Sequence, residues 1–424
     1  MEDKIISVRA QQIIDCKCRP AVEVEVQTQS GALGRGAAPT GTSVGMHESF
    51  VLRDGDPSSY KGLSVHKAVD HAVNVIGPAL IGMNVFDQRA IDEKMIALDG
   101  TPDKHRLGGN TIYSVSIAVF RAAAAARSIP LYEHIAGREI WTVPVPCFNV
   151  INGGRYDGFT QAFNEFLIVP YGTNSIDYSI EMAVAVFHKL SDVLTEYLGH
   201  KPQVASSYGY AAPSDDPEVI LTLMQKAIDA CGYTNQIAFA LDCASSEMYD
   251  KQTGRYLLKG RHVSSSEMVA YAKSLTEKFN LVFIEDLLDE NDWTGYSLAV
   301  KELTRTIVLG DDLTVTNLEL LRKAHETRAV DGFVLKPNQV GTITEAMDAY
   351  QFAQAHGMIA VPSGRSGGVV DDVVMDFSVG LEVPFQKNGA PRSGERIEKL
   401  NFLMRANARS PACRLYDISP LLRF

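Results

Sequence analysis

Short apolar runs that each lead into a charged residue recur at a regular interval in the second half of the chain. Three such runs cover 282–284, 307–310 and 332–335, and they lead into Glu285, Asp311 and Lys336. The charged ends lie 26 and then 25 residues apart, which fits one strand, one helix and two loops. Buried parallel strands have continuous apolar sequences, so this rhythm predicts an α/β fold, a βα barrel.

The same rhythm continues on both sides of these three runs. Upstream, 163–168 is an apolar strand candidate that contains Glu165, and 237–241 ends at Asp242. Downstream, 358–361 leads into the glycine-rich turn 363–368, and a last segment reaches Lys387. Active sites of such barrels lie at the carboxyl ends of the strands, so these side chains are expected at one mouth.

The first third of the chain has a different pattern. Alternating apolar and polar residues at 22–26 predict a half-buried strand, and the pattern from 64 to about 136 is helical. Small and glycine residues at 39–45 predict a loop that could serve as a lid. We therefore expect two closely packed domains, an α+β domain over residues 1–137 and the barrel over residues 138–424.

The composition of the chain narrows the range of functions that it can have. The net charge of -11 argues against a nucleic-acid or membrane-surface partner, and no apolar run approaches the roughly 20 residues of a membrane span. The six cysteines lack the spacing of a zinc or redox motif, so free thiols are expected. A soluble intracellular protein is the expectation.

The three acidic strand ends indicate a metal site. Asp242, Glu285 and Asp311 would repel one another at one mouth unless a cation lay between them, and hard oxygen ligands favour Mg²⁺. The alternative is that each acid caps a helix or pairs with a lysine. Lys336 beside such a cation and a second lysine would have a lowered pKa and could act as a base, or it could simply form a salt bridge.

With these features in place, the chain resembles the enolase family from about Ile6 to Asn401. The resemblance rests on segments that occur in the family's order, at 39–45, 52–56, 149–154, 164–166, 284–286, 310–317, 336–342 and 389–392. It implies an enolase-type (β/α)8 barrel with an α+β amino-terminal capping domain, in a homodimer or higher homo-oligomer in the cytoplasm.

The resemblance also implies roles for single residues. Asp242, Glu285 and Asp311 would bind one Mg²⁺, and Ser43 in the lid would help to hold a second. Lys336 would remove the proton α to the carboxylate of a small phosphorylated substrate. The remaining implied contacts are Lys387 on the substrate carboxylate, Arg365 and Ser366 on its phosphate and carboxylate, and Glu165 as one of two acids near the leaving hydroxyl.

Departures from the family pattern gather on the leaving-group side. Tyr208 stands where the family has its second catalytic glutamate, and Tyr156 stands where it has a histidine. Gly364 replaces a second histidine, and the first turn reads Cys-Lys-Cys-Arg, ending at Arg19. A missing general acid typically costs 10²–10⁴-fold, so ordinary enolase activity is expected to be weak.

Three functions follow from this pattern. The favoured one is Mg²⁺-dependent α-proton abstraction from 2-phosphoglycerate, coupled to a second anion such as phosphonoformate, as carboxyphosphonoenolpyruvate synthase does in phosphonate biosynthesis. Arg155 and Arg19 would supply positive charge for that anion, and Tyr156 and Tyr208 would line the altered site. The first alternative is a phosphopyruvate hydratase in which a tyrosine replaces the acid. The second is a non-catalytic, enolase-like binding protein.

Overall fold

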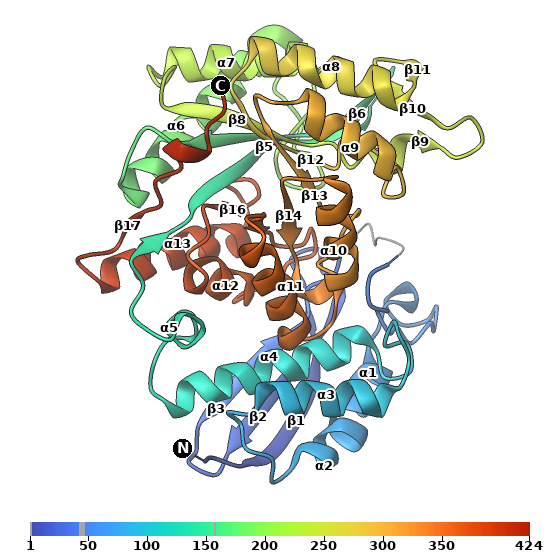
Figure 1. Ribbon diagram of the computed structural model, residues 1–424, viewed down its shortest axis with the longest axis vertical. Coiled ribbons are helices and arrows are strands. Elements are labelled where there is room, and N and C mark those ends of the chain that lie inside the picture. The colour runs from blue at the N-terminus through green and yellow to red at the C-terminus, as the bar shows by residue number, and fades with distance from the viewer. Residues whose placement is uncertain (1, 42–46, 157) are drawn as a thin grey trace.

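The amino-terminal part is a three-stranded antiparallel sheet covered by helices. In the computed structural model, which describes residues 2–41, 47–156 and 158–424, this sheet and its helices form the lower part of the molecule in Figure 1. Its strands, in the order β1-β2-β3, are β1 (Ile5–Ile14), β2 (Pro20–Thr28) and β3 (Leu33–Ala37). The helices are α1 (His66–His71), α2 (Gly77–Leu80), α3 (Gln88–Asp99), α4 (Gly109–Ala126) and α5 (Leu131–Ala136), with the short turns η1 (Tyr60–Gly62) and η2 (Ala72–Ile76).

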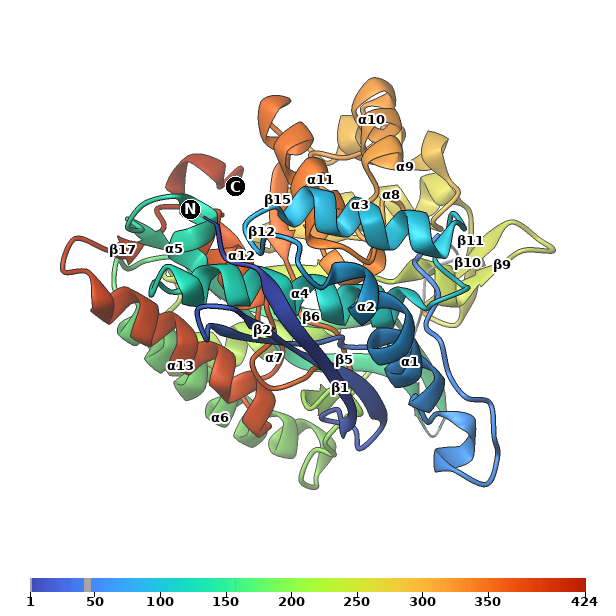
Figure 2. The same ribbon diagram turned by 90° about the horizontal axis from the view of Figure 1, so that it is seen from below.

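Helix α4 is the centre of this part, and Figure 2 shows it crossing the sheet. Most of its residues are buried, because the alanine-rich sequence leaves room for close neighbours on several sides. The strand β3 approaches the helix through Gly34 and Gly36. A methyl group on Gly34 would lie 2.0 Å from the Ala118 carbonyl oxygen.

Substitution of Gly36 by alanine is expected to destabilise the fold. The added carbon would lie 2.4 Å from the Ser114 carbonyl oxygen and 2.7 Å from the Ala118 nitrogen, and backbone atoms cannot yield as a flexible side chain can. Overpacking of this kind costs about 1–3 kcal/mol. Thermal melting should show the loss, whereas the control Gly394→Ala, which meets no atom within 4 Å, should melt like the wild type or higher. Equal melting of the two variants would contradict this account.

The rest of the chain forms a closed barrel. Its strands are β5 (Val145–Tyr156), β6 (Phe159–Pro170), β8 (Ile237–Asp242), β12 (Leu281–Glu285), β13 (Ile307–Gly310), β14 (Gly332–Leu335), β15 (Ile359–Pro362) and β16 (Phe385–Lys387). They pair in the order β15-β14-β13-β12-β8-β6-β5-β16, and a parallel bridge between Ser363 and Lys387 joins the two ends. The strand β6 runs antiparallel to both of its neighbours, and the other pairs of the ring are parallel.

Helices surround this barrel (Figure 1). They are α6 (Ile176–Leu198), α7 (Pro217–Ala230), α8 (Ser265–Lys278), α9 (Trp293–Glu302), α10 (Leu318–Thr327), α11 (Ile343–Ala355), α12 (Val374–Gly380) and α13 (Gly394–Arg409). The shorter elements are β4 (Thr142–Val143), β7 (Tyr210–Ala211), β9 (Tyr249–Asp250), β10 (Arg255–Leu258), β11 (Arg261–Val263), β17 (Arg414–Leu415), η3 (Ser245–Met248), η4 (Pro337–Gln339) and η5 (Ser419–Leu421). Side-chain caps fix several helix starts, among them a capping box in which Ser264 and Glu267 exchange hydrogen bonds.

The amino-terminal helices dock on α11. Asp92 of α3 is fully buried and accepts hydrogen bonds from the Thr344 amide at 3.0 Å and from the Ser116 hydroxyl at 2.7 Å. Lys104, which is buried, adds an ion pair with the partly exposed Glu345 at 3.0 Å. Hydrogen-bonded polar groups at a buried contact are costly to separate, so the cap holds a fixed position over the barrel.

The predicted fold class and barrel strands are confirmed, but one strand was missed. No strand was expected between residue 138 and the strand candidate at 163–168, yet β5 begins at Val145 and includes Pro146. It pairs with both β6 and β16, so it completes the ring. The expected boundary, Gly137, caps α5 with a φ of 68°, and a division into two domains at that point stays a prediction.

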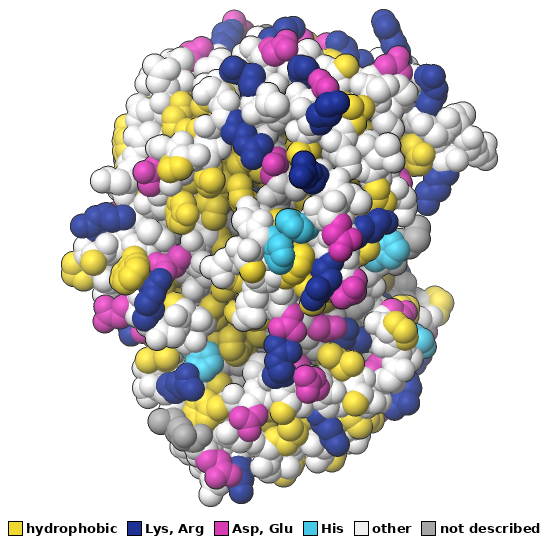
Figure 3. Space-filling view, viewed as in Figure 1, with side chains coloured by type: hydrophobic (Ala, Val, Ile, Leu, Met, Phe, Trp, Pro, Cys, Tyr) yellow, Lys and Arg dark blue, Asp and Glu magenta, His cyan; other side chains and the backbone are white. Residues whose placement is uncertain are grey.

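The six cysteines are free thiols, as expected, and all of them lie in the described part of the chain. No helix among the described residues has the length and apolar character needed to cross a membrane. On the face in Figure 3, dark blue and magenta side chains are interspersed rather than gathered by sign. This face therefore presents no basic patch for a nucleic acid.

Candidate active site

Acidic side chains occupy four neighbouring strands at one mouth of the barrel. They are Glu165 in β6, Asp242 at the end of β8, Glu285 at the end of β12 and Asp311 directly after β13. Basic side chains occupy the next three strands, with Lys336 after β14, Arg365 after β15 and Lys387 at the end of β16. The mouth is thus divided into an acidic arc and a basic arc, around a cavity of about 310 Å³.

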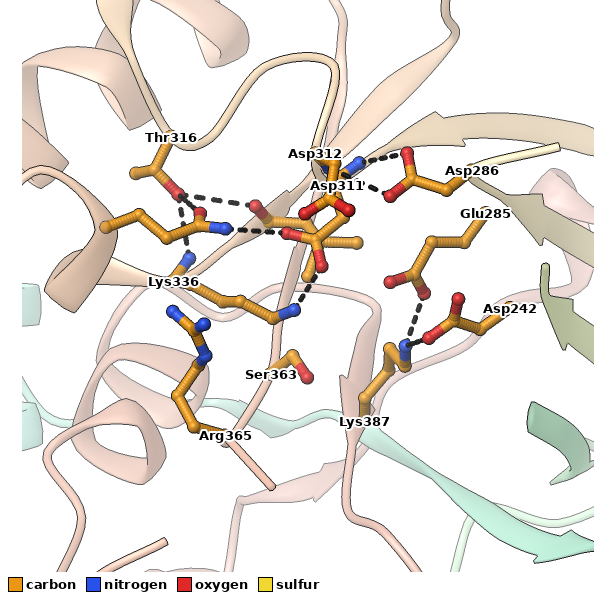
Figure 4. Close-up of polar contacts among 12 residues, drawn as sticks. Asp242, Glu285, Asp286, Asp311, Asp312, Thr316, Lys336, Ser363, Arg365 and Lys387 are labelled. Atoms are coloured by element: carbon orange, nitrogen blue, oxygen red, sulfur yellow. Dashed lines mark hydrogen bonds and ion pairs between the residues drawn. The ribbon is translucent and has the colours of Figure 1, made fainter. Parts of the chain in front are cut away.

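Lys387 reaches across to the acidic arc. Its ammonium nitrogen lies 2.9 Å from an Asp242 oxygen and also pairs closely with Glu285 (Figure 4). A Glu165 oxygen lies 3.5 Å from the same nitrogen. Burial alone would lower the pKa of Lys387, but the Asp242 and Glu285 carboxylates outweigh burial and raise it well above its ordinary value. Lys387 is therefore a fixed positive charge at the centre of the mouth.

The acidic arc has the donor set for a divalent cation. Glu285 is fully buried, and its Oε1 atom has no hydrogen-bond partner among the residues that the structure describes. Burial and the nearby Asp242 carboxylate raise the pKa of Glu285 well above its ordinary value. These oxygen ligands suit Mg²⁺, and Asp242, Glu285 and Asp311 are the residues that could hold it.

A second acidic group adjoins this arc and was missed in the sequence. Carboxylate oxygens of Asp286, Asp311 and Asp312 all lie within 4.8 Å of one another. Asp286 accepts hydrogen bonds from the backbone N–H groups of Asp311 at 2.9 Å and Asp312 at 2.8 Å, and from the Tyr296 hydroxyl at 3.1 Å. Asp286 therefore orients the loop after β13 and points Asp311 toward the mouth.

Lys336 pairs with Asp311 across the boundary between the two arcs (Figure 4). Gln339 donates a hydrogen bond of 2.9 Å to the other Asp311 oxygen, which fixes the carboxylate. Burial would lower the pKa of Lys336, but the Asp311 carboxylate raises it above its ordinary value. The lowering expected beside a bound cation stays a prediction, and in the contacts that the structure describes the Asp311 carboxylate dominates. The salt-bridge alternative from the sequence describes these contacts.

The turn after β15 forms the floor of the basic arc. Arg365 donates hydrogen bonds to both carboxylate oxygens of Glu48, at 2.7 and 3.1 Å, and both residues are buried. Ser363, Arg365 and Ser366 line the cavity, as an anion-binding turn would. Ser43, the expected ligand of a second Mg²⁺, lies outside the described residues.

The two altered tyrosines donate hydrogen bonds from their hydroxyl groups to backbone carbonyl groups. The Tyr156 hydroxyl donates to the Asn152 carbonyl at 2.7 Å, and the Tyr208 hydroxyl donates to the Cys16 carbonyl at 2.7 Å. Burial raises the pKa of Tyr156, and it also raises the pKa of Tyr208. Neither phenol is among the described groups that line the cavity, so a role as substitute acid has no geometric support.

The two arginines expected near a second anion also lie away from the lining that the described residues form. Arg19 donates to Asp15 at 2.9 Å and to the carbonyl groups of Thr40 and Gly41 at 3.0 and 3.3 Å. It therefore holds the backbone at residues 40 and 41. Arg155 is exposed. Contacts of Arg19 and Arg155 with a substrate stay predictions.

Three further charged residues line the cavity and were missed in the sequence. They are Glu247 in η3 and Arg396 and Lys399 in α13. The helix spacing of Arg396 and Lys399 puts both on one face, which the sequence does show. The sequence does not show that this face points into the cavity, because it does not determine the path of the loop between β16 and α13.

Fold and mouth together define a (β/α)8-barrel enzyme with separate acidic and basic arcs at its active site. Residues 5–135 match the family described as "Enolase, N-terminal domain", and residues 140–416 match "Enolase, C-terminal TIM barrel domain". The chain is 41% identical over 402 residues to a protein named enolase from Methanococcus aeolicus, covering 95% of this chain and 94% of that protein. The chain belongs to the enolase family, a family of lyases.

Proposed function

We propose that this protein is a phosphopyruvate hydratase, which dehydrates 2-phosphoglycerate to phosphoenolpyruvate. The division of the mouth into an acidic and a basic arc carries this proposal, because the substrate has two anionic groups and needs both a base and an acid. The curated relative, named enolase, supports the hydratase better than the synthase-like coupling that the sequence favoured.

The base and the acid stand on opposite sides of the ring. Lys336 follows β14 and Glu165 lies in β6, and these strands are four positions apart in the barrel order. Groups placed in this way can act on opposite faces of a small substrate held between them. We assign proton removal from C2 to Lys336 and proton donation to the leaving hydroxyl to Glu165.

The proposed reaction balances with these two residues. The C2–H bond breaks and the proton passes to the neutral Lys336 amine, while the electron pair moves into the substrate carboxylate. The electron pair then returns to form the C2–C3 double bond as the C3–O bond breaks, and a proton from Glu165 converts the departing hydroxide to water. Asn149 donates a hydrogen bond of 2.7 Å to Glu165, which orients the acid.

Mg²⁺ is proposed as the cofactor, with two ions bound in each active site. Bound there, it would neutralise the substrate carboxylate and make the α proton more acidic. Asp242, Glu285 and Asp311 would hold the first ion, and Ser43 is proposed for the second. Lys387 would contact the substrate carboxylate, and Arg365 and Ser366 its phosphate.

Coupling to a second anion is the alternative, and one observation favours it. The cavity contains Arg396 and Lys399 in addition to Lys336, Arg365 and Lys387, so it holds more positive charge than the sequence predicted there.

A homodimer or higher oligomer also stays a prediction.

Phosphorus NMR separates these two functions. The protein is incubated with Mg²⁺ and 2-phosphoglycerate, with and without phosphonoformate. We expect phosphoenolpyruvate to form without phosphonoformate and its rate to stay unchanged or fall when phosphonoformate is added. Product that appears only with phosphonoformate, carrying a new phosphonate resonance, would overturn the hydratase in favour of coupling.

A further inference from the structure

Gly364 leaves room for a third lysine, Lys399, beside Lys336 and Lys387 in the cavity. Lys399 lies on α13 and its side chain is almost fully buried, yet it lines the cavity beside the turn after β15. A methyl group built on Gly364 would lie 2.3 Å from the Lys399 nitrogen and 3.3 Å from its Cε atom. The ammonium thus fills the space that a side chain at position 364 would take.

Two buried acids hold this lysine in place. Its nitrogen lies 2.5 Å from Glu395, four residues earlier on the same helix, and the Asp372 carboxylate is also close. Glu395 and Asp372 are 4% and 5% exposed, so the charges are shielded from bulk water. Asp372 Oδ2 has no hydrogen-bond partner among the described residues, and it lies 4.0 Å from the same position on Gly364.

We propose that Lys399 is a substrate-binding cation and that Gly364 determines specificity by admitting it. An ammonium has three N–H donors, and the ion pair with Glu395 leaves donors for a ligand. The ligand would be a phosphate or carboxylate oxygen of the substrate, because Ser363 and Arg365 line the same side of the cavity. This inference rests on the proposed function for the identity of that substrate.

The test measures binding of inorganic phosphate to the Mg²⁺-loaded protein by calorimetry, together with KM for 2-phosphoglycerate. We expect Lys399→Met to weaken phosphate binding and to raise KM by about tenfold, the effect of a lost charge-assisted hydrogen bond. Gly364→Ala should have a similar effect, because the methyl group displaces a flexible ammonium and leaves the fold intact. The matched control is Lys301→Met, the same change at an exposed position of α9.

A double-mutant cycle separates this role from a structural one. If Gly364 acts by admitting Lys399, then Gly364→Ala should have almost no further effect in the Lys399→Met background. Equal effects of Gly364→Ala in both backgrounds would overturn the inference. Lys399→Met combined with Glu395→Gln removes one of the two buried acids that Lys399→Met alone leaves without its lysine, and wild-type phosphate affinity in that variant would also overturn it.

Phosphate binding is measured without turnover, so the inference and the proposed function can fail separately. Weaker phosphate binding in Lys399→Met, in a protein that forms no phosphoenolpyruvate, would keep the inference and overturn the hydratase. Active hydratase with unchanged phosphate affinity and KM in Lys399→Met would do the reverse.

Discussion

Replacement of Lys336 by alanine should abolish exchange of the C2 proton of 2-phosphoglycerate and, with it, formation of phosphoenolpyruvate. Lys336 is the proposed base, and its nitrogen already lies in the cavity, oriented by Asp311. Loss of a positioned base costs about 10²- to 10⁴-fold in rate. Proton NMR of the substrate in deuterated water measures the exchange directly.

Lys336→Arg is the matched control for charge. Arginine preserves the positive charge and an ion pair with Asp311, but it stays protonated in proteins and cannot accept the proton. We expect exchange to be lost in both variants, and Lys336→Arg, which keeps the ion pair, should melt at a higher temperature than Lys336→Ala. Exchange at the wild-type rate in either variant would assign the base to another residue.

Replacement of Glu285 by glutamine should weaken Mg²⁺ binding by more than about tenfold, because the site loses one of its three carboxylate charges. Glutamine has nearly the same shape, and Glu285 is completely buried, so the change is chiefly one of charge. A ligand that binds the folded state raises the melting temperature. Mg²⁺ should therefore stabilise the wild type more than the variant at the same concentration.

The matched control for this prediction is Glu326→Gln, at an exposed position of α10. Chelation of the metal should stop turnover in the wild type and in this control alike. An unchanged Mg²⁺ response in Glu285→Gln would show that the cation binds elsewhere, for example at Asp286 and Asp312.

The sequence predicted the barrel because buried parallel strands are continuous apolar runs with charged ends. Glu285, Asp311 and Lys336 each lie at or directly after a strand, as expected. The strand β5 was missed because it contains a proline, and because its pairing with β16 depends on residues far away in the chain. Propensity within one segment carries no information about those partners.

The site was predictable in its residues but less so in its contacts. Spacing placed Lys387 and Asp242 at the same mouth, but their direct ion pair depends on side-chain direction. Arg19 shows the same limit, because its guanidinium turned toward Asp15 and the backbone instead of the cavity. Lys399 was missed because only the packing of α13 shows that it reaches the space beside Gly364.

The most direct test follows 2-phosphoglycerate in deuterated water with Mg²⁺ and no other anion, by proton and phosphorus NMR together. The two steps of the proposed reaction are measured separately. Deuterium at C2 measures proton removal by Lys336, and phosphoenolpyruvate measures loss of the hydroxyl group. We predict that the wild type produces both signals. Deuterium at C2 without phosphoenolpyruvate, or neither signal, would contradict the proposal that this enolase-family protein is a phosphopyruvate hydratase.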